Sequence, residues 1–209
     1  MFEEVVAAKL YNRENPAAKK PVVNHLLFCE HPHVFTLGKS GAPSNLLITD
    51  ELLEKIEARF YKINRGGDIT YHGPGQIVGY PIFDLEALGI GIKEYIHLLE
   101  EALISALADL GIRASRLEGA TGVWLDVDQP QKARKISAIG VRASRFVSMH
   151  GFAFNVNTNL EYFRHINPCG FIDKGVTSLE KELGAPQSME AVKDLLFKKL
   201  SAAFGLTLA

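Results

Sequence analysis

RGGDITYHGPGQIVGYPIF, residues 65–83, joins a glycine-rich segment to a run of strand-forming residues. Five of the eighteen glycines of the chain lie in it. Glycine permits positive φ and lets another group approach the backbone closely, and consecutive glycines after a strand can direct several N–H groups at one carbonyl or oxyanion. A tight turn between two strands would explain Gly66–Gly67 alone. Asp68, Tyr71 and His72 add polar groups beside the turn, and together they favour a binding site.

Strand-like and helix-like runs alternate on both sides of this segment, which predicts a mixed α/β architecture. The segments expected to form strands are 21–29, 33–37, 60–64, 76–83, 112–117, 121–127, 134–142 and 150–157. Helices are expected over 49–59, with Thr49 as the cap, and over 92–110 and 188–204. In the helix over 92–110, leucines recur at spacings of three and four. That spacing leaves Glu100 on the side expected to face solvent.

The composition is that of an ordinary globular domain. The chain has 209 residues, 47% hydrophobic and 22% charged, which suits a single domain over residues 1–209. With 23 Lys+Arg against 24 Asp+Glu, the net charge is −1, which disfavours a general nucleic-acid binder. No apolar run approaches the roughly 20 residues that a membrane helix needs, and the N-terminus lacks the apolar core of a signal peptide. These features predict a cytoplasmic protein with both cysteines as free thiols.

RKISAIGV, residues 134–141, places Lys135 in a strand that is predicted to be half-buried. A lone lysine at the start of a strand is usually a solvated charge. The apolar run 123–125 before it and residues 136–141 after it favour a more enclosed setting. A lysine in such a setting must be paired or have its pKa lowered.

HGFAFNVN, residues 150–157, alternates large and small side chains along a predicted strand. The large ones are Phe152, Phe154 and Val156, and the small ones are Gly151, Ala153 and Asn155. An amphipathic strand whose phenylalanines fill the core is the simpler reading. The small face would also leave room for a long apolar chain, and His150 reads equally well as a structural or a catalytic residue.

INPCG places Cys169 between a proline and a glycine in a polar loop, which is unusual for a core cysteine. Cys29, by contrast, lies among aliphatic residues and is expected to be a small buried hydrophobe. A reactive thiol needs partial exposure and a positive neighbour. The candidate neighbours of Cys169 are Lys135, His150 and His72.

In this order and spacing, these segments closely resemble the lipoyl(octanoyl) transferases. The matching segments are EHPHVFTLGKSG (30–41), RGGDITYHGPGQIVGYPI (65–82), RKISAIGVR (134–142), HGFAFNVN (150–157) and INPCG (166–170). The resemblance implies an α/β fold of the α+β type, with a mixed sheet and packed helices, related to the catalytic domains of biotin protein ligases and lipoate–protein ligases. It also implies one octanoyltransferase catalytic domain over residues 1–209.

The resemblance further implies an acyltransferase. It would move an octanoyl group from the phosphopantetheine thioester of acyl carrier protein to a lysine of a lipoyl domain, in 2-oxoacid dehydrogenase complexes or the glycine cleavage H protein. By the same resemblance, Cys169 is the nucleophile that carries the acyl thioester, and Lys135 lowers its pKa and serves as general acid and base. The implied substrate-binding residues are Arg65, Gly66, Gly67, Asp68, Ile69, Thr70, Tyr71, His72, Ala138, Ile139, Gly140, Gly151, Phe152 and Ala153.

No cofactor is expected: neither ATP nor a metal, because the incoming thioester is already activated. Walker A and Rossmann signatures are both missing from the sequence. Backbone N–H groups near Gly75, Gly170 or residues 138–140 are candidates for stabilising the tetrahedral oxyanion.

Four other functions stay open at this point: an ATP-dependent lipoate or biotin ligase of the same fold, a cysteine hydrolase, a catalytically silent module that binds lipoyl domains or carrier proteins, and a relay enzyme acting between two lipoyl domains. Four cations near the predicted active strand suggest either a docking patch for an acidic carrier protein or a solvated strand edge. They are Lys132, Arg134, Arg142 and Arg145.

Overall fold

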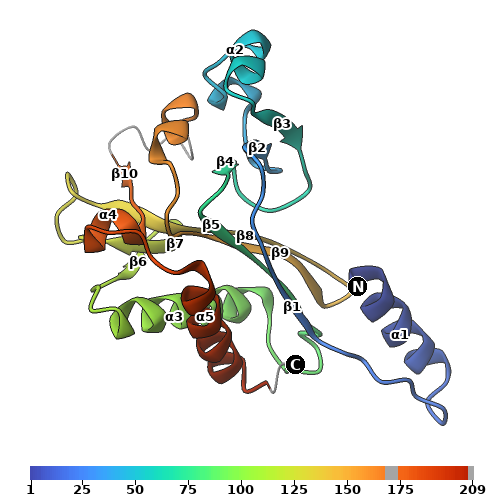
Figure 1. The fold of residues 1–209 in the computed structure, drawn as a ribbon. Helices are drawn as coiled ribbons and strands as arrows, with labels where there is room; N and C mark the ends of the chain where they lie inside the picture. Colours follow the sequence, from blue (N-terminus) through green and yellow to red (C-terminus); the bar gives the residue numbers. More distant parts are fainter. Residues whose placement is uncertain (168–173, 207–209) are drawn as a thin grey trace.

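The computed structural model describes residues 1–167 and 174–206, and over these residues the strands form two sheets (Figure 1). The larger sheet has the order β1 (His25–Cys29), β5 (Gln76–Ile82), β9 (Val147–Asn155), β8 (Arg134–Ser144), β7 (Ala120–Leu125) and β6 (Ser115–Leu117), with β10 (Gly175–Val176) paired to β8. Its pairings are antiparallel except for β10, which is parallel to β8. In the smaller sheet, β2 (Val34–Leu37) lies between β3 (Arg59–Lys62), which is parallel to it, and β4 (Ile69–His72), which is antiparallel.

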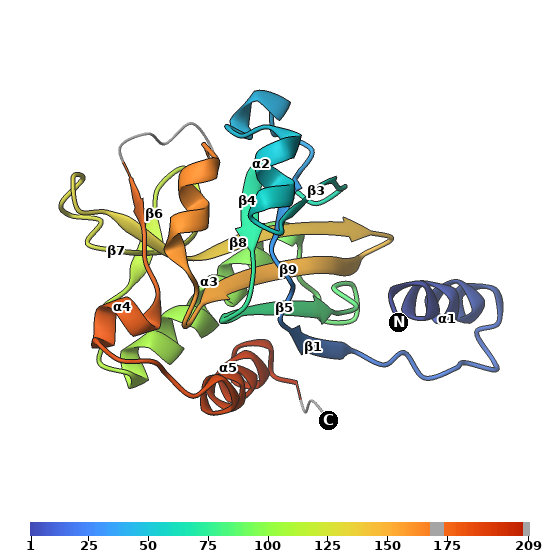
Figure 2. The ribbon, with the colours of Figure 1, turned by 45° about the horizontal axis from the view of Figure 1, so that its top comes forward.

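Two long helices, α3 (Ile92–Asp109) and α5 (Met189–Phe204), cover one face of the larger sheet. The other helices are α1 (Phe2–Glu14), α2 (Asp50–Lys55) and α4 (Leu179–Leu183), with the 3-10 helices η1 (Pro43–Asn45) and η2 (Leu160–His165). Figures 1 and 2 show α3 and α5 against one face, and the smaller sheet and α2 beyond the other. This mixed architecture confirms the predicted fold class.

The main core lies between α3, α5 and the larger sheet. Leu99, Leu103 and Leu107 of α3 and Leu196 and Leu200 of α5 have no exposed surface. Burying one such side chain contributes about 2 kcal/mol, so the leucine spacing noted in the sequence is what holds α3 on the sheet. The predicted helices over 92–110 and 188–204 are therefore confirmed.

A second core supports the smaller sheet. Phe35 and Tyr71 are fully buried there, and the ring of Tyr162 stacks on that of Tyr71 at 4.8 Å between centroids. Strand β4, which supplies Tyr71, was not among the predicted strands, because it lies inside the glycine-rich segment. Its four residues alternate buried and half-buried side chains, a signal too short to stand out among the glycines.

Two other local expectations are wrong. The helix expected over 49–59 has the predicted Thr49 cap but ends at Lys55, because the chain turns at Glu57 with φ +54° and enters β3. Glu100 is buried, with 7% of its surface exposed, instead of facing solvent. No sequence signal had indicated α1, α4 or β10.

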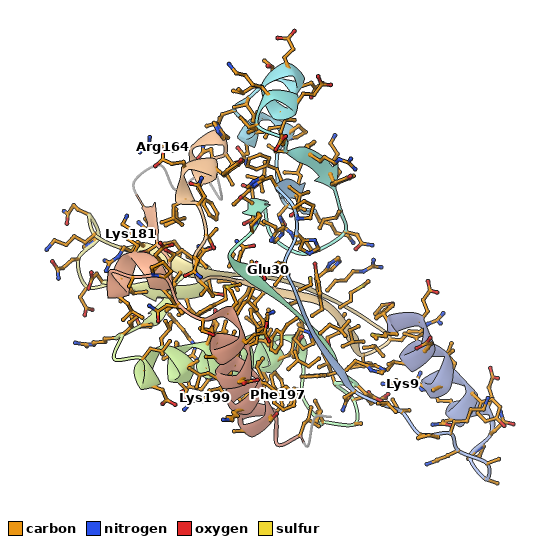
Figure 3. All side chains as sticks on the ribbon, viewed as in Figure 1. Lys9, Glu30, Arg164, Lys181, Phe197 and Lys199 are labelled. Carbon is orange, nitrogen blue, oxygen red and sulfur yellow. The ribbon has the colours of Figure 1, made fainter. Side chains whose placement is uncertain are left out.

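Helix α1 lies beside the body of the molecule and is attached by the buried Val5, which packs with Ile82 and Val147, and by ion pairs. Lys9, labelled in Figure 3, is buried against Asp84 and lies 3.0 Å from Glu86, which also pairs with Arg13 at 3.0 Å. Over the described ranges, no helix has the length and apolar character needed to cross a membrane.

Candidate active site

A cavity of about 740 Å³ is lined by residues of both sheets. That volume is within the usual range for small-molecule sites, roughly 300–1,000 Å³. Of the residues expected to bind substrate or act in catalysis, those lining it are Arg65, Gly66, Gly67, Asp68, Ile69, Thr70, His72, Lys135, Ala138, Ile139, Gly140, Gly151, Phe152 and Ala153. Segments far apart in the sequence thus meet at one cavity.

Among the expected residues that the structure describes, Tyr71 is not part of this lining. Tyr71 lies in the core of the smaller sheet, where its hydroxyl bonds to the ring of His33 at 2.7 Å. Burial raises the pKa of Tyr71, so its phenol stays protonated. Cys169, and Gly170 with it, lies outside the described residues.

Small residues let the cavity walls approach each other. A Cβ at Gly151 would lie 2.0 Å from the carbonyl oxygen of Gly79, and one at Gly140 would lie 2.9 Å from that of Gly66. Phe154 points to the helix side and fills the main core, whereas Ala153 and Asn155 face the cavity. The alternation in β9 therefore both fills the core with Phe154 and leaves small residues at the cavity, the two uses that the sequence suggested for this strand.

A chain of hydrogen bonds crosses the cavity from the smaller sheet to the larger one. Gln76 donates from Nε2 to the carbonyl of Tyr71 (3.1 Å) and to Oδ1 of Asn155 (2.9 Å). A carbonyl only accepts, so Oε1 of Gln76 faces Nδ1 of His72, 2.9 Å away, and Nδ1 carries the ring proton. The Thr36 hydroxyl, 3.3 Å from Nε2 of His72, then supplies the other bond. These partners hold the His72 ring in one tautomer and one orientation.

The pKa of His72 is lowered to about 4, mainly because burial disfavours the imidazolium, with Arg65 and His31 adding repulsion. The unfolded chain, with a histidine pKa near 6.5, therefore takes up a proton that the folded protein does not bind between these pH values. Stability that is fully present above pH 6.5 is lost as the pH falls to about 4.

We expect the free energy of unfolding of His72→Gln to fall by about 2 kcal/mol less than that of the wild type between pH 7 and pH 4.5. This figure is discounted for solvent screening, because the side chain of His72 is half-buried. Urea unfolding at pH 7 and pH 4.5 measures it. His97→Gln, an exposed histidine of α3, should keep the wild-type pH dependence. The same pH dependence in His72→Gln would contradict the assignment.

Arg65 connects the glycine-rich segment to β2. It is 7% exposed, and its guanidinium donates to the carbonyl of Thr36 at 2.5 Å, to the Thr36 hydroxyl at 3.0 Å and to the carbonyl of Gly66 at 3.0 Å. These bonds use the planar fork of arginine to fix the backbone of Gly66 at the cavity wall. In the structure, Arg65 thus lines the cavity and holds the adjacent backbone of Gly66 in place.

Lys135 reaches the cavity from β8. Its Nζ donates to the carbonyl of Thr121 at 3.1 Å and lies 4.6 Å from the ring centroid of Trp124, a cation–π distance. In the sheet, Lys135 pairs with Trp124 on one side and Val176 on the other. The lysine therefore lies among protein groups and is not a freely solvated charge.

Hydrogen bonds fix the described residues on both sides of the segment that contains Cys169. On the entering side, the Asn167 amide donates to the carbonyl of Asn45 at 2.8 Å. On the returning side, Lys174 and Gly175 line the cavity, and the Thr177 amide donates to the carbonyl of Lys135 at 2.9 Å.

An ion pair fixes the returning side. Arg134 binds Glu182 through two nitrogens, at 2.7 and 2.6 Å, and these bonds are the main reason that the pKa of Glu182 is lowered. The same carboxylate accepts the hydroxyl of Thr177. The start of β8, β10 and α4 is thereby one connected unit.

Three sequence interpretations need correction. Cys29 is half-buried on an edge strand, with Sγ 3.5 Å from Nε2 of His31, and is not a simple core hydrophobe. Gly75 is not a free oxyanion donor, since its N–H bonds to Glu30 at 3.0 Å where the chain passes between the sheets (Figure 3). Arg134 and Arg142 lie eight residues apart on β8, roughly 25 Å, so they do not form one basic patch.

The roles of some residues at the cavity were not predicted from the sequence. Gln76 and Asn155 are polar residues inside otherwise apolar strands, and both are buried. An isolated buried amide in such a run is a usable signal, because it must have hydrogen-bond partners. Trp124 was noted only as part of an apolar run. Within the described ranges, no cluster of three or more His, Cys, Asp or Glu is arranged to hold a metal ion.

Comparison with known proteins agrees with this geometry. Residues 2–201 match the lipoyl protein ligase A/B catalytic domain family. An octanoyltransferase of Parabacteroides distasonis is 62% identical over 195 residues, covering 93% of this chain and 85% of the relative. An octanoyltransferase of Cytophaga hutchinsonii is 55% identical over 207 residues, covering 99% and 85%.

Solved structures show the same fold at low sequence identity. The bipartite lipoate protein ligase of Thermoplasma acidophilum has a TM-score of 0.72 at 16% identity, covering all of this chain and 80% of its own. A biotin protein ligase of Aquifex aeolicus has a TM-score of 0.53 at 15% identity, with 81% and 70% covered. The chain belongs to the lipoyl protein ligase A/B catalytic domain family and, within it, to the octanoyltransferases, which are acyltransferases.

Proposed function

We propose that this protein transfers an octanoyl group from octanoyl-acyl carrier protein, through a thioester on Cys169, to a lysine of a lipoyl domain. The acceptor domains are those of 2-oxoacid dehydrogenase complexes and the glycine cleavage H protein. The observation that carries the proposal is that Lys135 lines the cavity and pairs in register with Val176. The described chain after Cys169 returns to this cavity at Lys174–Val176, beside the strand that holds the lysine, and this supports the proposal.

In the first step, the Cys169 thiolate attacks the thioester carbonyl of the donor. A C–S bond to Cys169 forms, the C–S bond to phosphopantetheine breaks, and the Lys135 ammonium gives its proton to the departing thiolate. A free thiol with a pKa near ~8.5 is mostly protonated at neutral pH. An ammonium close to it favours the thiolate by Coulomb attraction.

In the second step, the neutral amine of the acceptor lysine attacks the acyl-enzyme carbonyl. The amide C–N bond forms, the C–S bond to Cys169 breaks, and Lys135, now neutral, accepts the proton of the amine. The thiolate and the ammonium are restored together. Neither step consumes ATP or needs a metal, because the thioester supplies the activation. The thiol must stay free, as in a reducing cytoplasm.

The octanoyl chain is proposed to lie along the apolar and small residues of the cavity wall, among them Val78, Ala138 and Phe152. At about 0.8 kcal/mol per buried CH₂, its middle methylenes contribute roughly 4–5 kcal/mol of binding. One methylene more or less changes binding by only about 1–3 kcal/mol. Discrimination between octanoyl and its nearest neighbours in length is therefore modest.

A transfer assay without nucleotide tests the proposal. The purified protein, octanoyl-acyl carrier protein and a lipoyl domain are incubated, and the intact mass of the lipoyl domain is followed. We expect the mass of one octanoyl group to be added, and no addition when the acceptor lysine is replaced. Transfer only with ATP would indicate a ligase, and transfer only from an octanoylated lipoyl domain would indicate a relay enzyme. Release of free octanoate without an acceptor would indicate a hydrolase.

A further inference from the structure

Glu100 of α3 is a buried carboxylate that connects two other elements. Its side chain is 9% exposed. One oxygen, Oε1, accepts the backbone N–H of Gly122 in β7 at 2.9 Å. The other, Oε2, accepts Nε of Arg116 in β6 at 3.0 Å. A carboxylate taken this far from water needs such partners, and here both of its oxygens have one.

Gly122 is where β7 departs from regular strand geometry. Its φ is +121°, and the register between β7 and β8 shifts just after it, between Val123 and Trp124. The Gly122 N–H therefore turns toward α3, where Glu100 accepts it. A Cβ at this position would lie 2.5 Å from the carbonyl oxygen of Ser137 and 3.4 Å from Cε of Lys135. The stem of Lys135 thus passes directly over Gly122.

Thr121, before Gly122, and Trp124, two residues after it, contact the ammonium of the same lysine. The carbonyl of Thr121 accepts from Nζ of Lys135, and the ring of Trp124 lies beneath the ammonium. The path of Lys135 is therefore set by the irregular part of β7. That irregularity is held from the opposite side by one carboxylate, that of Glu100.

We propose that Glu100 is a positioning residue that holds β7 in the shape that places Lys135, an inference that rests on the proposed function. It acts through the Gly122 N–H, since the described lining of the cavity includes Lys135 and Thr121 but not Glu100. Arg116 keeps the carboxylate in place. It bonds in addition to Glu101 at 2.8 Å and to the carbonyl of His97 at 3.0 Å.

The test measures alkylation of Cys169 by iodoacetamide across pH, counted on the peptide that contains Cys169, together with octanoyl transfer. Glu100→Ala should move the alkylation profile to higher pH and slow transfer by roughly 10- to 100-fold, as a small misplacement of a reacting group does. Glu100→Gln should restore most of the wild-type profile, because its amide oxygen still accepts the Gly122 N–H. Glu101→Ala is the matched control, since it removes a partner of Arg116 without touching β7, and it should behave as wild type.

A second arm separates positioning from general stability. In a Lys135→Ala background, Glu100→Ala should add no further shift to the alkylation profile, because the lysine through which it acts is gone. If Glu100→Ala does not fold, Glu100→Asp replaces it, since its shorter side chain withdraws the carboxylate from Gly122.

A folded Glu100 variant with the wild-type profile overturns the inference, and so does an equal shift in the Lys135→Ala background. An unchanged profile in Lys135→Ala alone instead overturns the proposed role of Lys135, and this inference with it.

Discussion

Cys169→Ser is expected to abolish the octanoyl-enzyme adduct and to lower octanoyl transfer on the order of 10⁴-fold or more, as loss of a catalytic nucleophile does. A serine hydroxyl has the same shape, but an ammonium beside it does not ionise it near neutral pH. The thioester of the donor is therefore not attacked. Intact mass of the protein after incubation with octanoyl-acyl carrier protein, followed by peptide mapping, measures the adduct.

Cys29→Ser is the matched control for this experiment. The thiol of Cys29 lies 3.5 Å from the ring of His31, and burial raises its pKa. It is therefore mostly protonated at neutral pH and a poor nucleophile. We expect Cys29→Ser to form the adduct at the wild-type rate. An octanoyl group on the peptide of Cys29, or a persistent adduct in Cys169→Ser, would show that the nucleophile has been assigned wrongly.

Lys135→Ala is expected to lower transfer by roughly 10²- to 10⁴-fold, the usual contribution of a general acid–base group. It should also move the alkylation profile of Cys169 to higher pH, because removing a nearby cation disfavours the thiolate and so raises the pKa of the thiol. Rates of iodoacetamide labelling between pH 5 and pH 10 report the second effect independently of turnover.

Lys135→Arg separates the two roles of this residue. A guanidinium keeps the positive charge but does not give up its proton in proteins. The alkylation profile should stay close to wild type while transfer remains slow. Lys132→Ala, an exposed lysine just before β8, should leave both measurements unchanged. Normal transfer by Lys135→Arg would show that no proton passes through residue 135.

The parts of the fold that were predictable are those with a strong local signal. The leucine spacing of α3, the cap at Thr49 and the glycine after Phe204 all mark elements that the structure contains. Strand β4 was not predictable in the same way, because its four residues lie among glycines that indicate turns. Helix α1 has no clear apolar face, and it is attached by long-range contacts: the ion pair of Lys9 with Asp84, 75 residues away, and the packing of Val5 against Ile82 and Val147.

The residues of the site were likewise predictable only where the sequence carries a local pattern. Contiguous segments that resemble the octanoyltransferases are local patterns, and they pointed to fourteen of the described residues that line the cavity. Long-range pairing leaves no such pattern. Nothing in residues 92–110 indicates that Glu100 meets Gly122, because the meeting depends on a positive φ and a register shift in a strand formed later in the chain. The prediction that Tyr71 lines the site was wrong for a related reason, because the alternation of side chains along β4 turns Tyr71 toward the core of the smaller sheet.

The strand order of the larger sheet has a consequence for how the molecule folds. Next to its edge strand β1, Val78 of β5 pairs with Cys29 roughly 50 residues before it and with Ala153 roughly 75 residues after it. Such non-local pairings slow folding. The walls of the cavity depend on these pairings. Strand β9 can pair with β5 only after most of the chain has been synthesised. The cavity is therefore among the last parts of the protein to form. A nascent chain in which β9 has not yet been synthesised contains the glycine-rich segment but lacks the opposite wall of the cavity.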